Sequence, residues 1–142
     1  MEKYDCLKLE NQLCFPLYAC SRKIIKQYKP LLTKFDLTYT QYITMMVLWE
    51  NNEINVKELG EYLNLDSGTL TPLLKKLEKK EYITRHRSKK DERNLMITIT
   101  EKGNKLKREI LEVPEKMASC ICLKPEEAKQ LYELLYKVLK QP

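Results

Sequence analysis

The sequence predicts a mainly helical protein with one small β-hairpin. Most segments carry apolar residues at three- and four-residue intervals, as amphipathic helices do, and one short stretch alternates as strands do. The composition agrees, because 43% of the 142 residues are hydrophobic and 32% are charged, with only 3 Gly and 6 Pro. This favours an ordered, helix-rich globule over a disordered chain or a fibre. We expect a single domain over residues 1–142.

The first long helix is expected from about Lys8 to Thr33. Apolar residues recur along it at helical intervals, namely Leu9, Leu13, Leu17, Ile24, Tyr28, Leu31 and Leu32. Pro16 cannot donate a hydrogen bond to the carbonyl of Gln12. It therefore either kinks this helix or marks its first regular turn.

Two capping boxes predict the helices that follow. Residues 38–41 read Thr-x-x-Gln and open a helix through Trp49. Residues 55–58 read Asn-x-x-Glu and open a short helix that ends near Leu63. Asn64 can adopt the left-handed conformation that ends such a helix.

A further helix after a tight turn completes this region. Asp66 can cap a helix from Ser67 to about Lys80. Its inward face would be formed by Leu70, Leu73, Leu74 and Leu77. Helices of about nine and about fourteen residues, joined by a short turn, have the spacing of a helix-turn-helix, which ordinary αα-hairpins share.

The pattern changes from helical to alternating after Tyr82. Residues 95–100 alternate, and residues 83–87 supply an antiparallel partner. The loop between them, residues 88–94, is almost entirely charged and should project into solvent. A helix-turn-helix followed at once by such a hairpin is a winged helix, and the combination is far more specific than either part.

Two helices are expected after the hairpin. Thr100 can cap a helix over residues 101–117 with a bend at Pro114. Pro125 suits the first turn of a last helix that ends near Lys140 and has a broad apolar stripe.

Apolar stripes at both ends of so small a chain can hardly all be covered internally. A two-fold homodimer is the economical arrangement. We therefore expect dimerisation helices in residues 1–35 and 101–142, flanking a winged helix-turn-helix in residues 36–100.

Positive charge is concentrated in one region. The net charge is +6, and residues 75–93 hold nine Lys and Arg against four Asp and Glu. Such a local patch is the electrostatic footprint of a phosphate-binding surface, although a solvated lysine-rich face gives the same count.

The location of this patch favours double-stranded operator DNA as a partner. Small hydroxyls near a helix N-terminus can approach base edges while lysines contact phosphates, and arginines enter narrow minor grooves. The candidate contacts are Ser67, Thr69, Thr71, Lys75 and Lys76 on the helix, and Arg85, Arg87, Lys89, Lys90 and Arg93 on the wing. Asp91 would orient a wing arginine. The alternatives are that the hydroxyls only cap or solvate the helix, and that Arg93 pairs with Asp91 or Glu92.

Several other classes of protein are disfavoured. No apolar run is long enough to span a bilayer, and the N-terminus lacks a signal-peptide pattern, so a cytoplasmic protein without membrane contact is expected. Five cysteines cannot form a complete intramolecular disulfide framework. Without a Cys-x2-Cys pair, and with His86 as the only histidine, no metal and no cofactor are expected.

Five segments resemble a known family. Residues 37–42, 66–78 and 91–103 resemble the MarR family of dimeric winged-helix transcription regulators. Residues 9–18 and 27–32 resemble its organic-hydroperoxide-sensing branch, the OhrR repressors.

The resemblance implies that Cys14 is the peroxide-sensing thiol, oxidised first to a sulfenic acid. It implies that Tyr28 and Tyr39 hydrogen-bond to this cysteine across the dimer interface, with Tyr18 nearby. The chemistry is consistent, because the thiolate is the nucleophile and a helix N-terminus stabilises negative charge. Without the surrounding motif, an inert buried cysteine would be the commoner interpretation.

The family contains one-cysteine and two-cysteine members. In the first type a small cellular thiol caps the sulfenic acid, and in the second a C-terminal cysteine of the partner subunit forms a disulfide with it. Cys120 and Cys122 lie where such a resolving cysteine would be, whereas Cys6 and Cys20 resemble spare thiols. A low-molecular-weight thiol remains the alternative partner.

The expected function is that of a redox-sensing repressor and not of an enzyme. A homodimer would hold two recognition helices about 34 Å apart on a pseudo-palindromic operator. It would leave the operator when an organic hydroperoxide oxidises Cys14. Two alternatives stay open: a regulator of this fold gated by a noncovalent small ligand, and a thiol peroxidase that uses Cys14.

Overall fold

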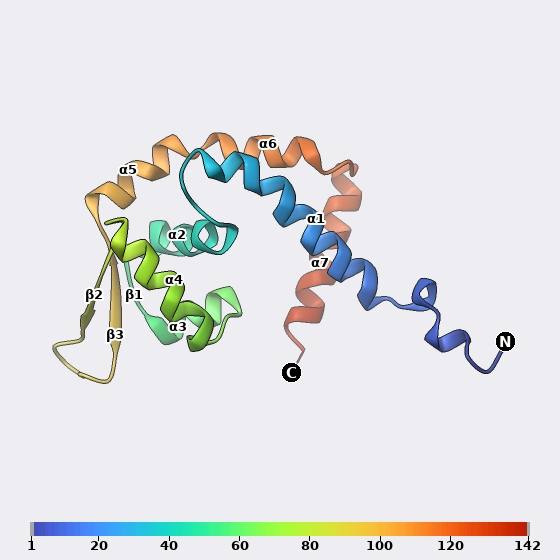
Figure 1. The fold of residues 1–142 in the computed structure, drawn as a ribbon, viewed down its shortest axis with the longest axis horizontal. Coiled ribbons are helices and arrows are strands. Elements are labelled where there is room, and N and C mark those ends of the chain that lie inside the picture. Colours follow the sequence, from blue (N-terminus) through green and yellow to red (C-terminus); the bar gives the residue numbers. More distant parts are fainter. Residues whose placement is uncertain (1, 142) are drawn as a thin grey trace.

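The computed structural model describes residues 2–141 and confirms the mainly helical fold with a small wing. Two 3-10 turns, Asp5–Leu7 and Leu9–Asn11, precede the first α-helix. The remaining elements of this described part follow in the order α1 Cys14–Thr33, α2 Tyr39–Asn51, β1 Glu53–Asn55, α3 Val56–Leu63, α4 Ser67–Lys79, β2 Ile83–Arg87, β3 Leu95–Ile99, α5 Glu101–Glu109, α6 Glu112–Cys120 and α7 Pro125–Leu139 (Figure 1).

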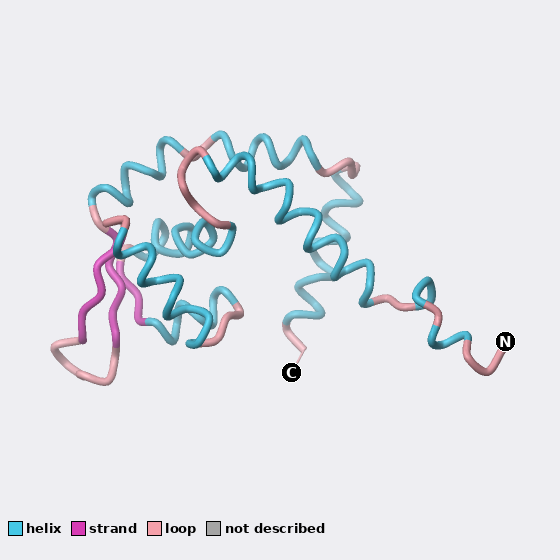
Figure 2. The backbone as a smooth tube through the Cα atoms, viewed as in Figure 1, coloured by secondary structure: helices cyan, strands magenta, loops and turns pink. Residues whose placement is uncertain are grey.

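The helix-turn-helix and the wing lie together beneath an arch of other helices. Figure 2 shows α3, α4 and the three strands on one side of the molecule, with α5 and α6 running above them. Helix α1 packs against α2 and α6 and extends away from the winged unit, and α7 descends from the far end of α6 (Figure 1). The N-terminal segment continues outward beyond α1.

The core lies inside the winged unit. It is built from α2, α3, α4, the sheet and the two helices above, and its fully buried side chains include Tyr42, Met45, Leu48, Leu59, Leu70, Leu74, Leu77, Ile83, Ile97 and Val113. The predicted inward face of α4 is confirmed, since all four of its leucines are buried. The terminal helices differ, because no residue of α7, which is wholly described, is buried.

Most predicted helix ends are confirmed by their hydrogen bonds. Thr38 and Gln41 form the complete reciprocal capping box. Asn64 is left-handed at φ 54 and ψ 42, and the Asp66 side chain accepts from the Thr69 amide at 2.7 Å. Thr100 accepts from the amide of Gly103 in the same way, at 3.1 Å.

The hairpin is confirmed, and a third strand joins it. Strands β2 and β3 pair antiparallel with Ile83 opposite Ile99, and β1 pairs with the other edge of β3, with Ile54 opposite Ile97. The sequence did not predict β1. A strand of three residues is too short to show alternation.

The first helix begins at Cys14, so the start predicted near Lys8 was wrong. The residues before it form 3-10 turns, which the Gln12 amide holds by donating to the carbonyls of Cys6 at 2.7 Å and Lys8 at 3.0 Å. Pro16 falls in the first turn of α1, where its missing N–H costs no helical hydrogen bond.

The single helix predicted over residues 101–117 is two helices. The break lies between Glu109 and Glu112, and Pro114 falls in the first turn of α6 instead of at a bend. A proline ring clashes with the carbonyl four residues earlier, here that of Ile110, so the helix ends one turn before the proline.

Candidate DNA-reading surface and redox centre

The turn between α3 and α4 places the N-terminus of α4 in solvent. Asp66 caps α4, and the hydrogen bond that it accepts from the Thr69 backbone lowers the pKa of its carboxyl. The turn is tight because Gly60 has no side chain: a Cβ there would lie 2.7 Å from the carbonyl oxygen of Leu65. The structure therefore presents α4 as the exposed helix of a helix-turn-helix.

The predicted contact residues of α4 share its exposed face. They are Ser67, Thr69, Thr71, Lys75 and Lys76, all exposed and opposite the buried leucines. The Thr71 hydroxyl donates to the carbonyl of Ser67 at 2.8 Å and keeps its lone pairs free to accept. Hydroxyls at the helix start and lysines further along suit contacts to bases and phosphates.

The wing divides its cations into two groups. Arg87, Lys89, Lys90 and Arg93 are exposed along β2 and the loop. Arg85 instead reaches back to α4, where its Nη2 lies 3.0 Å from Oε1 of Glu78. Its backbone N–H also donates to Glu78, at 3.2 Å. Arg85 therefore joins the wing to the recognition helix and does not project from it.

Asp91 shapes the wing loop through the backbone. Its Oδ1 accepts from the N–H of Arg93 at 3.0 Å. This bond holds the backbone turn that carries Arg93. The predicted role of Asp91 in orienting a wing arginine stays a prediction.

Cys14 occupies the first position of α1, and its side chain is exposed. Its neighbours Leu13, Phe15 and Leu17 are also exposed, Leu13 by 80%. An apolar surface therefore surrounds a thiol at the positive end of a twenty-residue helix. Cys6, Cys20, Cys120 and Cys122 are likewise exposed free thiols. Cys120 ends α6, and Cys122 lies in the loop before α7.

Three tyrosines form a cluster where α1 meets α2. The ring centroid of Tyr28 lies 4.8 Å from that of Tyr39 and 5.8 Å from that of Tyr42. Burial raises the pKa of all three phenols, that of Tyr42 to about 12. Each hydroxyl is therefore neutral and can donate at physiological pH. Tyr42 was not among the predicted sensor residues, and its spacing of three from Tyr39 on α2 was the available signal.

Within one chain the structure places Tyr18 one turn from Cys14 and Tyr28 far from it. Tyr18 accepts from Nη1 of Arg22 at 3.2 Å on the open side of α1. Tyr28 follows Cys14 by fourteen positions on the same helix, which is about 21 Å along the axis. Cys14 therefore cannot touch Tyr28 of its own chain.

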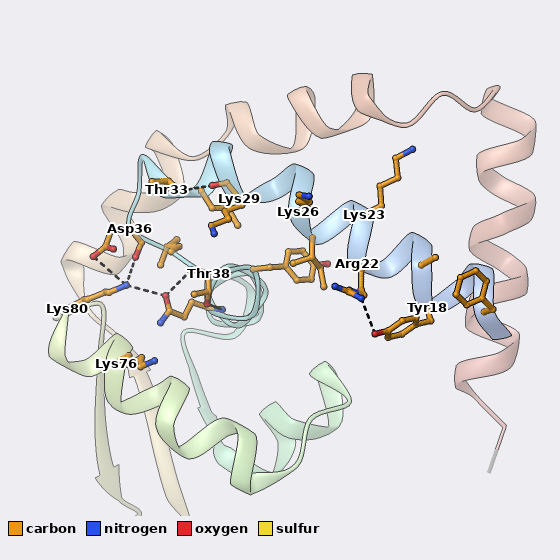
Figure 3. A pocket seen from close by; sticks show the side chains of 17 residues that line it. Tyr18, Arg22, Lys23, Lys26, Lys29, Thr33, Asp36, Thr38, Lys76 and Lys80 are labelled. Carbon is orange, nitrogen blue, oxygen red and sulfur yellow. Dashed lines mark hydrogen bonds and ion pairs between the residues drawn. The ribbon is translucent and has the colours of Figure 1, made fainter.

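A basic cleft lies between α1, α2 and α4 (Figure 3). It has a volume of about 1110 Å³ and extends from Phe15 and Tyr18 to the recognition helix. Its cationic lining is Arg22, Lys23, Lys26, Lys29, Lys76 and Lys80, with Asp36 as the acidic residue. The sequence did not predict this cleft, because its cations are spread over about sixty residues and come from two helices, α1 and α4.

Within residues 2–141 no helix is both long and apolar enough to cross a bilayer. The same part of the chain holds no cluster of three or more His, Cys, Asp or Glu that could bind a metal ion.

Known sequences share most of this chain. A family model described as transcriptional regulator SarA/Rot matches residues 26–110. The organic hydroperoxide resistance transcriptional regulator of Bacillus subtilis strain 168 is 49% identical over 138 residues, 97% of this chain and 94% of that protein. The HTH-type transcriptional regulator SarZ of Staphylococcus aureus USA300 is 48% identical over 123 residues, 87% of this chain and 83% of that protein.

Solved structures of AbfR from Staphylococcus epidermidis share the fold. Reduced AbfR bound to DNA matches with a TM-score of 0.80 at 37% identity, over 98% of this chain and 97% of that one. Disulfide-formed AbfR matches with a TM-score of 0.68 at 35% identity, over 97% of each chain.

Proposed function

The chain belongs to the MarR family of winged-helix, DNA-binding transcription regulators, and we propose that it acts there as a redox-sensing repressor. A homodimer occupies a pseudo-palindromic operator while Cys14 is reduced and leaves it when an organic hydroperoxide oxidises Cys14. The observation that carries the proposal is the exposed thiol at the start of α1, the helix whose other end meets the DNA-reading unit.

The two-fold symmetry of the dimer requires an operator with two inverted half-sites. Each protomer contributes one α4, and two such helices about 34 Å apart fit successive major grooves on one side of the duplex. In this proposal Ser67, Thr69, Thr71, Lys75 and Lys76 meet the major groove and its phosphates, and Arg87, Lys89, Lys90 and Arg93 meet the neighbouring minor groove.

Oxidation begins at the Cys14 thiolate. Its Sγ forms a bond to the terminal oxygen of the hydroperoxide, the O–O bond breaks, and the alkoxide leaves and takes up a proton to become an alcohol. The sulfur is now a sulfenic acid. Tyr28 and Tyr39 of the partner subunit donate their neutral hydroxyls to the sulfur, which is why the proposal needs two chains.

A second thiol then resolves the sulfenic acid. The thiolate of Cys120 or Cys122 of the partner subunit attacks Sγ, a disulfide forms, and the hydroxyl leaves as water after protonation. Both candidates are exposed at the end of α6. A low-molecular-weight thiol can do the same reaction and yields a mixed disulfide.

A comparison of shapes supports a link between redox state and DNA binding. This chain has a TM-score of 0.80 with AbfR bound to DNA and 0.68 with disulfide-formed AbfR. In a protein 35–37% identical to this one, disulfide formation thus accompanies a different arrangement of the same elements. Overoxidised AbfR bound to DNA also matches with a TM-score of 0.80, so we infer that it is disulfide formation at Cys14 that shifts the present chain in the same sense.

Electrophoresis without reductant tests the resolving step. After treatment with cumene hydroperoxide, the protein should run as a crosslinked dimer, and Cys14→Ser should abolish that band. Cys120→Ser and Cys122→Ser, tested separately, identify the resolving residue. A persistent monomer with the mass of an added small thiol would assign the step to that thiol instead.

The basic cleft favours a second candidate function. Its six cations and its apolar walls suit an anionic aromatic or aliphatic ligand, so the regulator could be gated without covalent chemistry. Operator release by hydroperoxide in the wild type but not in Cys14→Ser would exclude this gate as the main signal. The thiol peroxidase alternative is set aside, because the relatives are transcription regulators and not enzymes.

A further inference from the structure

Lys80 ends the recognition helix and reaches across to the corner between α1 and α2. Its Nζ donates to the carbonyl oxygen of Asp36 and to Oε1 of Gln41, the latter at 3.2 Å. The Asp36 carboxylate lies 3.6 Å from the same ammonium. Figure 3 shows Lys80 and Asp36 in contact at one end of the basic cleft, which both residues line. The Lys80 side chain is 26% exposed and that of Asp36 is 90% exposed, so water screens the ion pair and the hydrogen bonds to the Asp36 carbonyl and to Gln41 are the stronger part of the link.

The corner that Lys80 grips is itself firmly built. Asp36 is left-handed at φ 53, and Leu37 beside it is buried. Gln41 is 3% exposed and belongs to the capping box, where its Oε1 also accepts from the Thr38 amide at 3.1 Å. Lys80 is therefore bound to a rigid junction of two helices and not to a loose loop.

The same end of α4 is held on its other side. The carbonyl of Lys80 accepts from Nζ of Lys102 at 2.9 Å, and the carbonyl of Glu81 accepts from the Thr100 hydroxyl at 2.6 Å. The start of α5 thus holds the backbone of this helix end. The side chain of Lys80 links this end of α4 to the corner after α1.

We propose that Lys80 is the positioning residue through which α1 sets the orientation of the recognition helix. Helix α1 has twenty residues and is about 30 Å long, with Pro30 near its end, so it joins Cys14 to the Asp36 corner, and in this inference it carries a displacement at Cys14 to that corner. The charge-assisted bonds of Lys80 then pass that displacement to α4. This inference rests on the proposed function, because it supplies the path from the oxidised thiol to the DNA.

Lys80→Met tests the link, since it keeps an unbranched stem and removes all three donors. Lys79→Met is the matched control, because Lys79 is the exposed neighbour on the same helix and its loss removes the same charge. Thermal unfolding checks that each variant folds. The readouts are the operator Kd of the reduced protein and the ratio of Kd after and before hydroperoxide.

When both proteins are reduced, Lys80→Met should bind the operator at least about fivefold more weakly than Lys79→Met. The oxidation ratio, meaning the operator Kd after hydroperoxide divided by the Kd before it, should be about tenfold smaller for Lys80→Met than for the wild type. Lys79→Met should keep the wild-type ratio. Should Lys80→Met not fold, Asp36→Asn provides the same test, since asparagine tolerates the left-handed backbone and only the carboxylate is lost. Its effects should have the same sign and be smaller.

The outcomes separate the two proposals. If hydroperoxide changes the operator Kd of both lysine variants by the same factor as in the wild type, the coupling role of Lys80 is overturned and the redox function still holds. An unresponsive wild type would overturn the redox function. The reduced proteins then still decide on Lys80, because equal operator Kd values for Lys80→Met and Lys79→Met would overturn its positioning role.

Discussion

Two arginines of the wing, Arg85 and Arg93, differ in what surrounds them. Arg85 is paired with Glu78, and the hydrogen bond from its side chain lowers the pKa of that carboxyl. Arg93 is exposed, and only its backbone is fixed, by Asp91. Position in the sequence does not distinguish them. Their contacts indicate that Arg93 can reach a groove, whereas Arg85 holds the wing.

Replacing each arginine should therefore give different results. Arg93→Ala should weaken operator binding about tenfold and lower the slope of log K against log salt by about 1. Arg85→Ala should lower the free energy of unfolding by up to about 1 kcal/mol, since its ion pair is partly exposed, and should leave the salt slope unchanged. Fluorescence anisotropy at several salt concentrations measures both slopes, and equal slopes for the two variants would contradict the assignment.

The tyrosine cluster predicts a dependence of stability on pH. Burial raises the pKa of Tyr42 from 10.0 to about 12, so the folded state favours the neutral phenol. Its contribution is complete below pH 10 and is lost as the pH rises through 12. The difference amounts to at most about 3 kcal/mol. Urea unfolding between pH 8 and 12 should show this decline, and Tyr42→Phe should flatten it. Tyr62→Phe, at an exposed tyrosine, is the control and should not.

At the scale of elements, the glycines show which helix contacts are tight. Gly103 lies where α5 begins against the base of the wing, and a Cβ there would lie 2.5 Å from the carbonyl oxygen of Tyr82. The Trp49 indole also donates to the Gly103 carbonyl, at 2.9 Å. Gly68, in the first turn of α4, would meet only Oδ1 of Asp66, at 3.4 Å.

Alanine at these two glycines should have effects of opposite sign. Gly103→Ala forces backbone groups apart and should lower the free energy of unfolding by about 1–3 kcal/mol. Gly68→Ala replaces a residue of poor helix propensity and should raise the free energy of unfolding by up to about 1 kcal/mol. Chemical denaturation of both variants measures the two changes. Destabilisation of similar size at both positions would contradict the packing described for α5.

Local patterns predicted the elements whose cause is local. The capping residues Thr38, Asp66 and Thr100 bond as their spacing indicates, because a cap depends on a few consecutive residues. Strand β1 exists only because β3 offers it an edge, and that pairing spans more than forty residues. The three residues of β1 therefore carry no local pattern that predicts a strand.

At the scale of the whole molecule, apolar surface is concentrated at the ends of the chain. On α7, Leu131, Leu134, Leu135, Val138 and Leu139 are 37–62% exposed, and on α1 the residues around Cys14 are similarly open. A patch of this kind is typical of an interface. The same surfaces belong to the helices for which the sequence predicted dimerisation.

Sedimentation should therefore show a dimer at micromolar concentration. Leu134→Glu combined with Val138→Glu places two charges on one face of α7 and should shift the protein toward a monomer with weaker operator binding. Lys129→Glu, on the same helix, should remain dimeric. A monomeric wild type would contradict the two-fold arrangement on which the operator spacing depends.

The candidate site was predictable only in part, because some of its contacts join residues that are far apart in the sequence. Cys14 and the tyrosines were identified through the resemblance, and Tyr28 lies about 21 Å from Cys14 along α1, so the proposed sensor needs a second chain. Lys80 was counted only as part of a basic patch. Its contacts with Asp36 and Gln41 join residues about forty positions apart, which no local pattern reveals.

In the proposed function, the oxidation state of Cys14 controls how tightly this protein binds its operator. A gel shift with reduced and cumene-hydroperoxide-treated protein tests it, with wild type beside Cys14→Ser and with Cys20→Ser as the control for a neighbouring thiol. Oxidised wild type and Cys20→Ser should lose the complex, by about a thousandfold in Kd if the two states differ by about 4 kcal/mol. Cys14→Ser should keep it. Equal binding by treated and untreated wild type would contradict the account.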